Sequence, residues 1–451
     1  MSKRKSISTT QLIMLSFLLA LIVGSILLYL PISSATGKSV SYIDALFTAT
    51  TSICVTGLVT VPTYSTWSIF GQVVILLLIQ IGGLGVITVM FAFMVGFNKR
   101  IGIGNRILIQ DIFNLNSMSG VVKFLKNVII GTFVVEGVGA LLYMIVFVPE
   151  YGLKGIWFSI FNAISAFCNA GMDILGEDSL CSYVSNPIIN IVTCSLIILG
   201  GIGYIVWWDI LRCIRNIKKM GWRCFRFLTL HSKIALFMTG FFILIGTVVV
   251  FIFEYNNPNT MKEFSLFNKI QASVFQSVTT RTAGFMTIPQ QDFTQVSAII
   301  SMLLMIVGGS PSGTAGGVKT VTIAVLFASA FTTLKDEQDV VFFNRKVTEE
   351  AIKKSVAVIT IFLLIFLSST VLLASVINAD LLDIMYETIS ATATVGLSRN
   401  LTTLLGMSGK LIIIITMFLG RVGPISLFIA FYTKKTRHNI IRCPKEEISV
   451  G

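Results

Sequence analysis

The sequence predicts an all-α polytopic membrane protein in which four similar units surround one pore with pseudo-fourfold symmetry. Apolar residues make up 54% of the 451 residues and charged residues only 12%, against roughly a quarter charged in an ordinary soluble domain. Charge-free runs from Ser6 to Gly37, Ile234 to Phe253 and Ser355 to Ala379 each exceed the roughly 18 residues of a candidate membrane helix. One pattern of span, turn and span recurs four times. We therefore expect eight full spans plus four short reentrant pore helices.

The placement of charge along the chain indicates an orientation in the lipid bilayer. Most of the 34 basic residues lie before Gln11, in 99–126, 212–233 and 335–354, and after Tyr432. Cytoplasmic loops are the ones enriched in Lys and Arg. This pattern predicts a multi-pass protein of the cell membrane with both termini in the cytoplasm, and it explains the net charge of +13 without a nucleic-acid partner.

The outward segments carry mostly acidic residues, which would make a mildly attractive vestibule for cations. Ordinary solvated loops explain any single one of these acids equally well. The acids are Asp44, Glu150, Asp173, Glu177, Asp178, Glu254, Glu263, Asp380, Asp383 and Glu387.

Each of the four units contains a Thr/Ser/Ala-rich stretch that ends in a glycine and is followed by a second glycine feature. The first glycines recur at intervals of about 113 residues, at Gly57, Gly171, Gly284 and Gly396. The second features begin at Gly82, Gly200, Gly308 and Gly420. The units predicted from this register are 1–99, 100–212, 213–333 and 334–433, followed by a cytoplasmic tail, 434–451.

A reentrant loop is expected in the first unit because no charged residue occurs between Asp44 and Lys99. This segment is too long for one span. A helix over 42–52 would enter from outside, turn at Gly57 and return, leaving a full second span over 67–97. Non-helical backbone at membrane depth is tolerated where it is buried in protein or lines a watery cavity, so four such loops imply one central cavity.

Four glycine loops at one depth predict a filter for a monovalent cation. Such a filter uses inward-pointing backbone carbonyls in place of hydration water, and glycine adopts the required conformations with little strain. The short helices would also aim their partially negative C-terminal ends at the pore. The competing interpretation is a set of small-residue helix-packing motifs. The predicted filter residues are Cys54, Val55, Thr56, Gly57, Cys168, Asn169, Ala170, Gly171, Arg281, Thr282, Ala283, Gly284, Ala393, Thr394, Val395 and Gly396.

The third unit differs because glycines and a proline crowd its second span. No uninterrupted helix is expected through such a stretch. It would lie just inward of the filter, where it would obstruct the pore and move when the pore opens; a static kink is the alternative. The predicted gate residues are Gly308, Gly309, Ser310, Gly313, Gly316, Gly317, Lys319 and Arg421.

Four charged residues fall at membrane depth, where a charge is costly unless it is paired or hydrated. Lys319 and Arg421 would either bond the carbonyls of the glycine-rich stretch or act as an electrostatic barrier to cations. Arg281 is expected to turn behind the filter and brace it. Glu136 would pair with a cation or a backbone donor, and its role stays open.

These motifs together resemble a known family. The segments IDALFTATTSICVTGL, LIQIGGLGVIT, AISAFCNAG, TRTAGF, GGSPSGTAGGVK and FLGRVGPISL are similar to those of the Ktr/Trk/HKT superfamily of potassium transporters, and specifically to the Ktr-type membrane subunit. The resemblance extends from Gln11 to about Tyr432.

The resemblance implies a fold of four M1–P–M2 units and a function in potassium uptake. It implies a homodimer with one pore per protomer, seated on an octameric cytoplasmic ring of RCK-type regulatory subunits that bind ATP or ADP. It identifies the stretch 308–317 with the intramembrane gate, and Arg421 with the arginine that holds it. Gly57 favours potassium over sodium, whereas Cys54 and Cys168 replace residues that are often Thr or Asn and leave fine selectivity open. Potassium is the transported ion, sodium an activator or a coupling ion, and no covalently bound cofactor is expected.

Two other interpretations remain. A secondary carrier coupled to sodium or protons would also place ion sites at mid-membrane. An accessory subunit of a sodium-pumping ATPase, or a membrane enzyme, is the second. The sequence has no phosphate-binding GxxxxGK[ST] motif, metal-ligand cluster or Ser/His/Asp arrangement, and we therefore expect no enzymatic activity.

Overall fold

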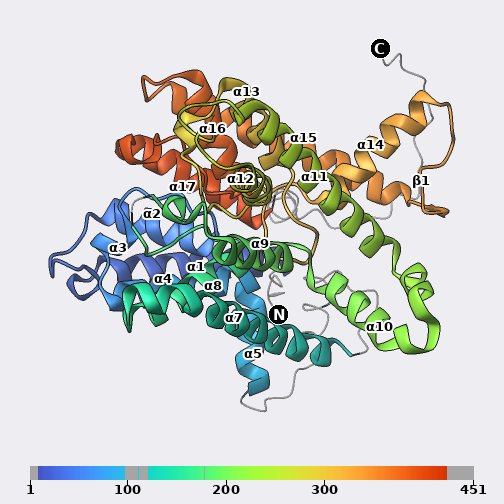
Figure 1. Ribbon diagram of the computed structural model, residues 1–451, viewed down its shortest axis with the longest axis horizontal. Helices are drawn as coiled ribbons and strands as arrows, with labels where there is room; N and C mark the ends of the chain where they lie inside the picture. Colours follow the sequence, from blue (N-terminus) through green and yellow to red (C-terminus); the bar gives the residue numbers. More distant parts are fainter. Residues whose placement is uncertain (1–8, 97–109, 111–119, 177, 424–451) are drawn as a thin grey trace, which may run out of the picture.

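The computed structural model describes residues 9–96, 110, 120–176 and 178–423 (Figure 1). In these residues the regular secondary structure is helical apart from one small hairpin, in which β1 (Val341–Phe342) pairs antiparallel with β2 (Arg345–Lys346). The predicted tail 434–451, Glu177 and most of the basic link that follows Lys99 lie outside the described residues.

Four long helices have the length and apolar composition to cross a membrane. They are α1 (Thr9–Tyr29), α7 (Val121–Tyr151), α11 (Leu230–Glu254) and α15 (Glu349–Ala374). Polar caps start two of them: the Thr229 hydroxyl accepts from the Ser232 N–H, and the Thr348 hydroxyl from the Ala351 N–H. Their outward faces are apolar; Leu141 and Ile145 of α7, for example, are 64% and 58% exposed. Large apolar side chains on the outside are what a lipid environment favours.

Four shorter helices lie inside the bundle although they are rich in Ser and Thr. They are α2 (Tyr42–Ile53), α8 (Lys154–Cys168), α12 (Leu266–Thr279) and α16 (Leu381–Ala393). Thr50, Ser165, Ser277 and Ser390 are all completely buried. Each short helix packs on the long helix that precedes it. Polar residues inside and apolar residues outside reverse the usual order of a soluble domain, so the protein is a multi-pass membrane protein.

The segments after the short helices are broken at the second glycine features. α4 (Ile69–Leu84) is followed by α5 (Val86–Gly96), α9 (Pro187–Gly201) by α10 (Tyr204–Met220), α13 (Gln295–Ile306) by α14 (Thr320–Leu334), and α17 (Met407–Val422) ends the described chain. The first two breaks fall at Gly85 and Gly203, whose φ angles are 87° and 93°, and α17 ends at Gly423, whose φ angle is 89°. The second span predicted over 67–97 is therefore interrupted at Gly85, because a left-handed residue cannot continue a right-handed helix.

The predicted eight uninterrupted spans are not confirmed. The described residues hold four helices that meet the length and composition of a span, or five if α9 and α10, bent by 102°, count as one. The remaining short elements are η1 (Pro31–Ser33), α3 (Thr63–Thr66), η2 (Cys181–Tyr183), η3 (Gly221–Phe227), η4 (Gln290–Asp292) and η5 (Thr402–Leu404).

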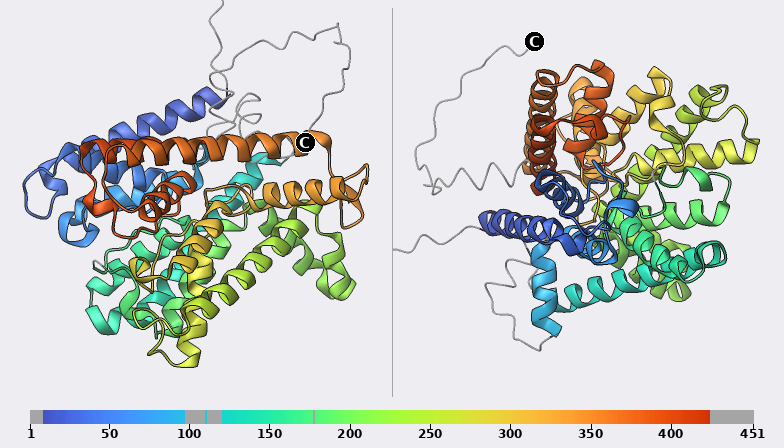
Figure 2. Two further views of the ribbon diagram at one scale, coloured as in Figure 1. Left: turned by 90° about the horizontal axis from the view of Figure 1, so that it is seen from above. Right: turned by 90° about the vertical axis from the view of Figure 1, so that its left-hand side faces the viewer.

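The helices close into a ring. α4 contacts α8, α9 contacts α12, α13 contacts α16, and α17 returns to contact α2 near the start of the chain. Figures 1 and 2 show the chain following its colour order around the bundle, so that the last helices lie beside the first. Each broken segment thus packs on the next short helix, and the short helices surround one centre.

Close packing at these contacts generates a stability prediction. A methyl group at Gly82 of α4 would overlap the carbonyl oxygen of Ile53, which is backbone and cannot rotate away. Gly137 of α7 has open space at the same position. We expect Gly82→Ala to destabilise the fold by about 1–3 kcal/mol, the usual cost of overpacking, and Gly137→Ala to leave it unchanged or slightly more stable. Thermal unfolding of the two purified variants in detergent measures this difference, and equal melting temperatures would contradict the packing.

Candidate functional site

The four predicted glycines meet in a closed ring of backbone. A methyl group on Gly57 would lie 3.2 Å from the Cα of Gly171 and 3.3 Å from that of Gly396, and one on Gly284 would lie 2.9 Å and 3.3 Å from the same two atoms. Each glycine also faces the carbonyl that precedes the next glycine. Those carbonyls belong to Ala170, Ala283, Val395 and Thr56, in chain order. The ring leaves no room for any side chain at these four positions.

The four loops share an unusual backbone conformation. The glycines have φ angles of 100°, 64°, 83° and 96° at Gly57, Gly171, Gly284 and Gly396. The residues two positions earlier are also left-handed, with φ of 55°, 61°, 68° and 52° at Val55, Asn169, Thr282 and Thr394. The residue between each pair is not left-handed. Such alternation turns successive carbonyls to the same side of a strand. Val55 is β-branched and therefore strained in this region, and strain of this kind concentrates at functional sites.

Hydroxyl groups at the ends of the short helices hold the loops in place. The N–H of Gly57 donates to Thr51 Oγ1 (2.9 Å), and the N–H of Gly396 donates to Ser390 Oγ (3.0 Å). The N–H of Met172 donates to Ser165 Oγ (3.1 Å). These residues were not among the predicted site residues. The signal that could have found them is a Ser or Thr five or six positions before each glycine.

In the third loop the backbone hydrogen bond that precedes the glycine spans one residue fewer than in the other three loops. Its Ala283 N–H donates to the carbonyl of Thr279, four residues earlier, whereas the corresponding bond spans five residues in the other loops, as from Thr56 to Thr51. The Thr279 hydroxyl donates to the carbonyl of Phe285 (2.6 Å), as the Ser165 hydroxyl does to that of Met172 (2.5 Å). The third unit is therefore the least symmetric of the four at the ring.

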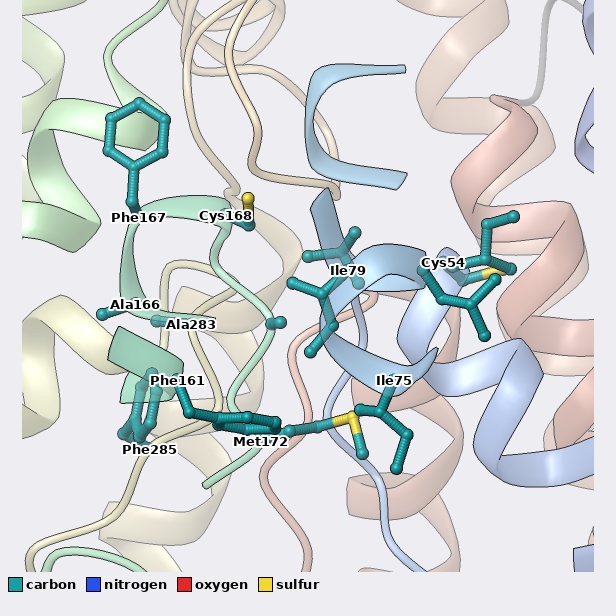
Figure 3. Packing of buried hydrophobic residues seen from close by; sticks show 14 of the residues in the cluster. Cys54, Ile75, Ile79, Phe161, Ala166, Phe167, Cys168, Met172, Ala283 and Phe285 are labelled. Carbon is teal, nitrogen blue, oxygen red and sulfur yellow. The ribbon is translucent and has the colours of Figure 1, made fainter. Parts of the chain in front are cut away.

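The short helices α2, α8, α12 and α16 all end directly before these loops. Their C-terminal ends, which carry partial negative charge, accordingly converge on the ring. Apolar side chains pack around it, as Figure 3 shows for Phe161, Met172, Phe285 and Ile75. The site thus combines the partially negative ends of four helices with an apolar surround, an arrangement that favours a cation over an anion.

An open cavity of about 540 Å³ lies over the ring and is lined by all four glycines. Among the described residues, Asp173 and Asp178 are the acids that line it. Two of the other predicted vestibule acids form ion pairs: Asp44 pairs with Lys410 (2.5 Å), and Asp383 with Arg399 (2.7 Å). The acids that line the cavity directly in the described residues therefore both belong to the second unit. Burial raises the pKa of Asp173 to about 6.

The glycine-rich stretch forms a non-helical loop between α13 and α14, here called the intramembrane loop (307–319). Its two ends pair, because the Gly308 N–H donates to the Val318 carbonyl (3.0 Å). The loop also bonds to the end of α9: the N–H groups of Ser310 and Thr314 donate to the carbonyls of Gly201 (2.8 Å) and Gly200 (3.1 Å). The loop is therefore held on both its third-unit and second-unit sides.

Two cations bind the carbonyls of the intramembrane loop. Arg421 donates to the carbonyl of Thr314 (2.7 Å) and to that of Gly82 (2.6 Å). Lys319 donates to the carbonyl of Ala315 (2.6 Å). Of the two roles considered from sequence, carbonyl bonding is the one that the structure shows.

The remaining two charges at membrane depth have different partners. Arg281 reaches behind its loop to the carbonyl of Thr239 in α11 (3.4 Å) and to that of Gly308 (3.3 Å). Glu136 of α7 accepts from the side-chain amide of Gln80 (3.0 Å). The expected partner of Glu136, a cation or a backbone donor, was wrong, because a neutral amide from α4 occupies that place.

Four backbone loops that meet at one ring inside a helical membrane bundle define a membrane transport protein for cations. Comparison with known proteins agrees: residues 3–441 match the TrkH family, described as cation transport protein, and the chain belongs to this family. The chain is 37% identical over 454 residues to the potassium/sodium uptake protein NtpJ of Enterococcus hirae, covering 99% of this chain and 98% of the relative. It is 38% identical over 442 residues to the Ktr system potassium uptake protein B of Bacillus subtilis, covering 98% and 96%.

A solved structure supports the fold. The potassium transporter TrkH from Vibrio parahaemolyticus matches with a TM-score of 0.76 at 15% sequence identity, over 96% of this chain and 86% of that chain. The predicted family is thereby confirmed, and the protein is a transporter, not an enzyme.

The vestibule generates a pH prediction. Above pH 6 the Asp173 carboxyl is ionised and attracts cations, and below pH 6 it is neutral, because burial raises its pKa to about 6. We expect the cation concentration for half-maximal uptake to rise roughly threefold as the external pH falls from 7.5 to 5, the effect of one unit charge several ångströms away in water. Uptake into proteoliposomes measures this, with Asp173→Asn predicted to remove the pH dependence. A variant that keeps the wild-type dependence would show that another group titrates.

Proposed function

We propose that this chain is the ion-translocating subunit of a Ktr-type potassium uptake system. The observation that carries the proposal is the closed ring of Gly57, Gly171, Gly284 and Gly396, approached by four loops of like conformation. Backbone carbonyls at such a ring replace the hydration shell of a potassium ion. The names of the relatives, which specify potassium or potassium/sodium uptake, support the same ion.

The proposed filter consists of the four residues that end at each glycine. Their side chains differ between loops, which backbone coordination permits and side-chain coordination would not. The cysteines in the first position do not change this interpretation. Cys54 and Cys168 are completely buried, and the Cys168 thiol lies 3.7 Å from Gln80 Oε1, behind the loop. Selectivity on this proposal depends on the backbone ring and its support.

We propose the same four units that the sequence register indicates, 1–99, 100–212, 213–333 and 334–433, with pseudo-fourfold symmetry around the ring. Each unit contributes a long helix, a short helix, a left-handed loop and a broken second segment. The contact of α17 with α2 supports this arrangement, because it joins the fourth unit to the first.

The intramembrane loop is the proposed gate, with Arg421 and Lys319 holding it by its carbonyls. The loop contacts residues that precede the filter glycines, whereas the described residues that line the open cavity come from other segments. On this proposal the loop would block an ion that had passed the ring. Its glycines suit a moving segment, since they permit several backbone conformations.

The proposed assembly is a homodimer on a cytoplasmic ring of nucleotide-binding regulatory subunits, with both termini of this chain in the cytoplasm. Support comes from the relatives whose names place them in Ktr systems. The name of NtpJ, which includes sodium, supports a role for sodium as activator or coupled ion.

A carrier coupled to sodium is the second candidate function, favoured by the same name. Flux under an imposed membrane potential separates the two. Potassium uptake that falls to zero without sodium identifies a carrier, whereas uptake that continues at a reduced rate identifies a channel-like pore with sodium as activator.

Substitution at the ring tests the proposed function directly. In cells that lack potassium uptake, the chain expressed with a Ktr-type regulatory subunit should restore growth at low potassium. Gly57→Ser should weaken this rescue and admit sodium, because a side chain at Gly57 would press on the Ala170 carbonyl (2.6 Å from the first side-chain carbon) and widen the ring. The measurement is the potassium-to-sodium permeability ratio, expected to fall at least tenfold, or about 1.4 kcal/mol of lost discrimination. An unchanged ratio would remove Gly57 from the filter.

Shortening the intramembrane loop tests the gate. Deleting residues 310–313 removes the bond from the Ser310 N–H to the Gly201 carbonyl and the segment that packs on α9. We expect potassium flux without the regulatory subunit to rise severalfold, toward the level of the activated wild type. The wild type measured with and without the regulatory subunit gives the two limits. Flux at or below the unactivated wild type would count against the gate.

A further inference from the structure

The left-handed residues that precede the filter glycines make direct contacts with the intramembrane loop. The Gly316 N–H donates to Thr282 Oγ1 (3.1 Å), and the Thr314 hydroxyl lies 3.1 Å from Asn169 Oδ1. A methyl group on Gly316 would overlap Thr394 Oγ1. Three of the four loops therefore place the same structural position, two residues before the glycine, against the loop.

Val55 occupies the fourth such position, and it differs from Asn169, Thr282 and Thr394 in both polarity and contacts. Val55 packs against Gly82 of α4, where a methyl group would lie 2.9 Å from Val55 Cγ2, and its apolar side chain cannot hydrogen-bond to the intramembrane loop. Val55 is also the apolar member of the set, whereas Asn169, Thr282 and Thr394 are polar. Polarity at this position thus follows contact with the loop and not coordination of the ion, which is the task of the backbone.

We infer that Thr282, Asn169 and Thr394 are positioning residues that seat the intramembrane loop on the filter, so that opening of the gate alters ion preference. The inference rests on the proposed function and extends it. Thr282 and Asn169 are completely or almost completely buried. When the loop leaves, the Gly316 N–H, the Thr282 hydroxyl and the Asn169 amide oxygen lose these contacts, and a buried polar group without a partner is costly. The filter backbone must then readjust or admit water.

The guanidinium of Arg281 adds a second link between the filter and the loop. It is adjacent to Thr282 in the chain and donates to the carbonyl of Gly308, at the start of the intramembrane loop. The two ends of the intramembrane loop therefore both contact the third loop of the ring. Gly308 contacts it through Arg281, and Gly316 contacts it through Thr282. By linkage the effect is reciprocal: a potassium ion that stabilises the filter conformation of the seated loop also favours the closed gate.

The test compares two threonines of the same segment. Thr282→Val keeps the shape of the side chain and removes the acceptor for the Gly316 N–H, whereas Thr282→Ser keeps the acceptor. Thr280→Val is the matched control, because the Thr280 hydroxyl donates to the Ser277 carbonyl at the end of its own helix (3.0 Å), and not to the intramembrane loop as far as the described residues show. The assay measures potassium and sodium fluxes into proteoliposomes with the full chain and no regulatory subunit.

We expect Thr282→Val to raise basal potassium flux about two- to tenfold, the range for one buried hydrogen bond, and to raise the sodium-to-potassium flux ratio. Thr280→Val should behave as the wild type, and Thr282→Ser, which keeps the acceptor, should change both quantities less than Thr282→Val does. An unchanged basal flux in Thr282→Val overturns the inference, and so does a changed ratio without a changed basal flux, since that marks a filter defect alone.

A second variant covers the case in which Thr282→Val does not fold as judged by size-exclusion chromatography. Gly316→Ala displaces the loop from Thr394 without altering any filter residue, and it should raise both basal flux and the sodium-to-potassium ratio. An effect on basal flux alone would show that the gate moves independently of the filter. A wild-type protein that shows no potassium preference would instead overturn the proposed function. The failure of the inference and the failure of the proposed function therefore give different results.

Discussion

The structure depends on one steric constraint, namely that four separate chain segments meet backbone to backbone at a ring with room only for hydrogen on each Cα. Gly57, Gly171, Gly284 and Gly396 satisfy it, and each faces a carbonyl of the next loop. A loop at membrane depth cannot rely on water for its hydrogen bonds, so the Ser and Thr residues of the short helices must supply them. This requirement explains why helices as polar as α2 and α16 are buried, and why the apolar helices α7 and α15 surround them.

The features that could be predicted from the sequence are those that only one type of residue can satisfy. Glycine marks a conformational requirement of the backbone, and the register of four glycines therefore identified all four loops that meet at the ring. The first short helix was predicted over 42–52 and observed over Tyr42–Ile53, because the polar stretch and the following glycine define both of its ends. The membrane class and the family followed from composition and from these same motifs.

Other features were not predictable because several residue types satisfy them or because they depend on distant parts of the chain. Nothing in a valine indicates that Val55 adopts φ 55°; the surrounding loops impose it. The break at Gly85 lies in an apolar stretch whose hydropathy continues unchanged on both sides, so a continuous span was the natural expectation. The pairing of Asp44 with Lys410 joins the first unit to the fourth, and only the closed ring of helices brings these residues together.

Three cationic side chains that contact the intramembrane loop occur in the third and fourth units alone. A single chain can place such residues in selected units, whereas four identical subunits would repeat them in every unit. None of Arg281, Lys319 and Arg421 forms a salt bridge within the described residues; all three donate to backbone carbonyls. Carbonyls are also the groups that would coordinate a passing potassium ion. In the proposed closed state, protein cations therefore occupy carbonyls of the intramembrane loop and add electrostatic repulsion to steric obstruction. A charge at membrane depth keeps its low energy only while it is paired or hydrated, so Arg421 can release Thr314 only if water or another carbonyl replaces it. In the proposed open state, water that enters the widened pore would supply that replacement, and hydration of the pore and release of the loop would then be two parts of the same event.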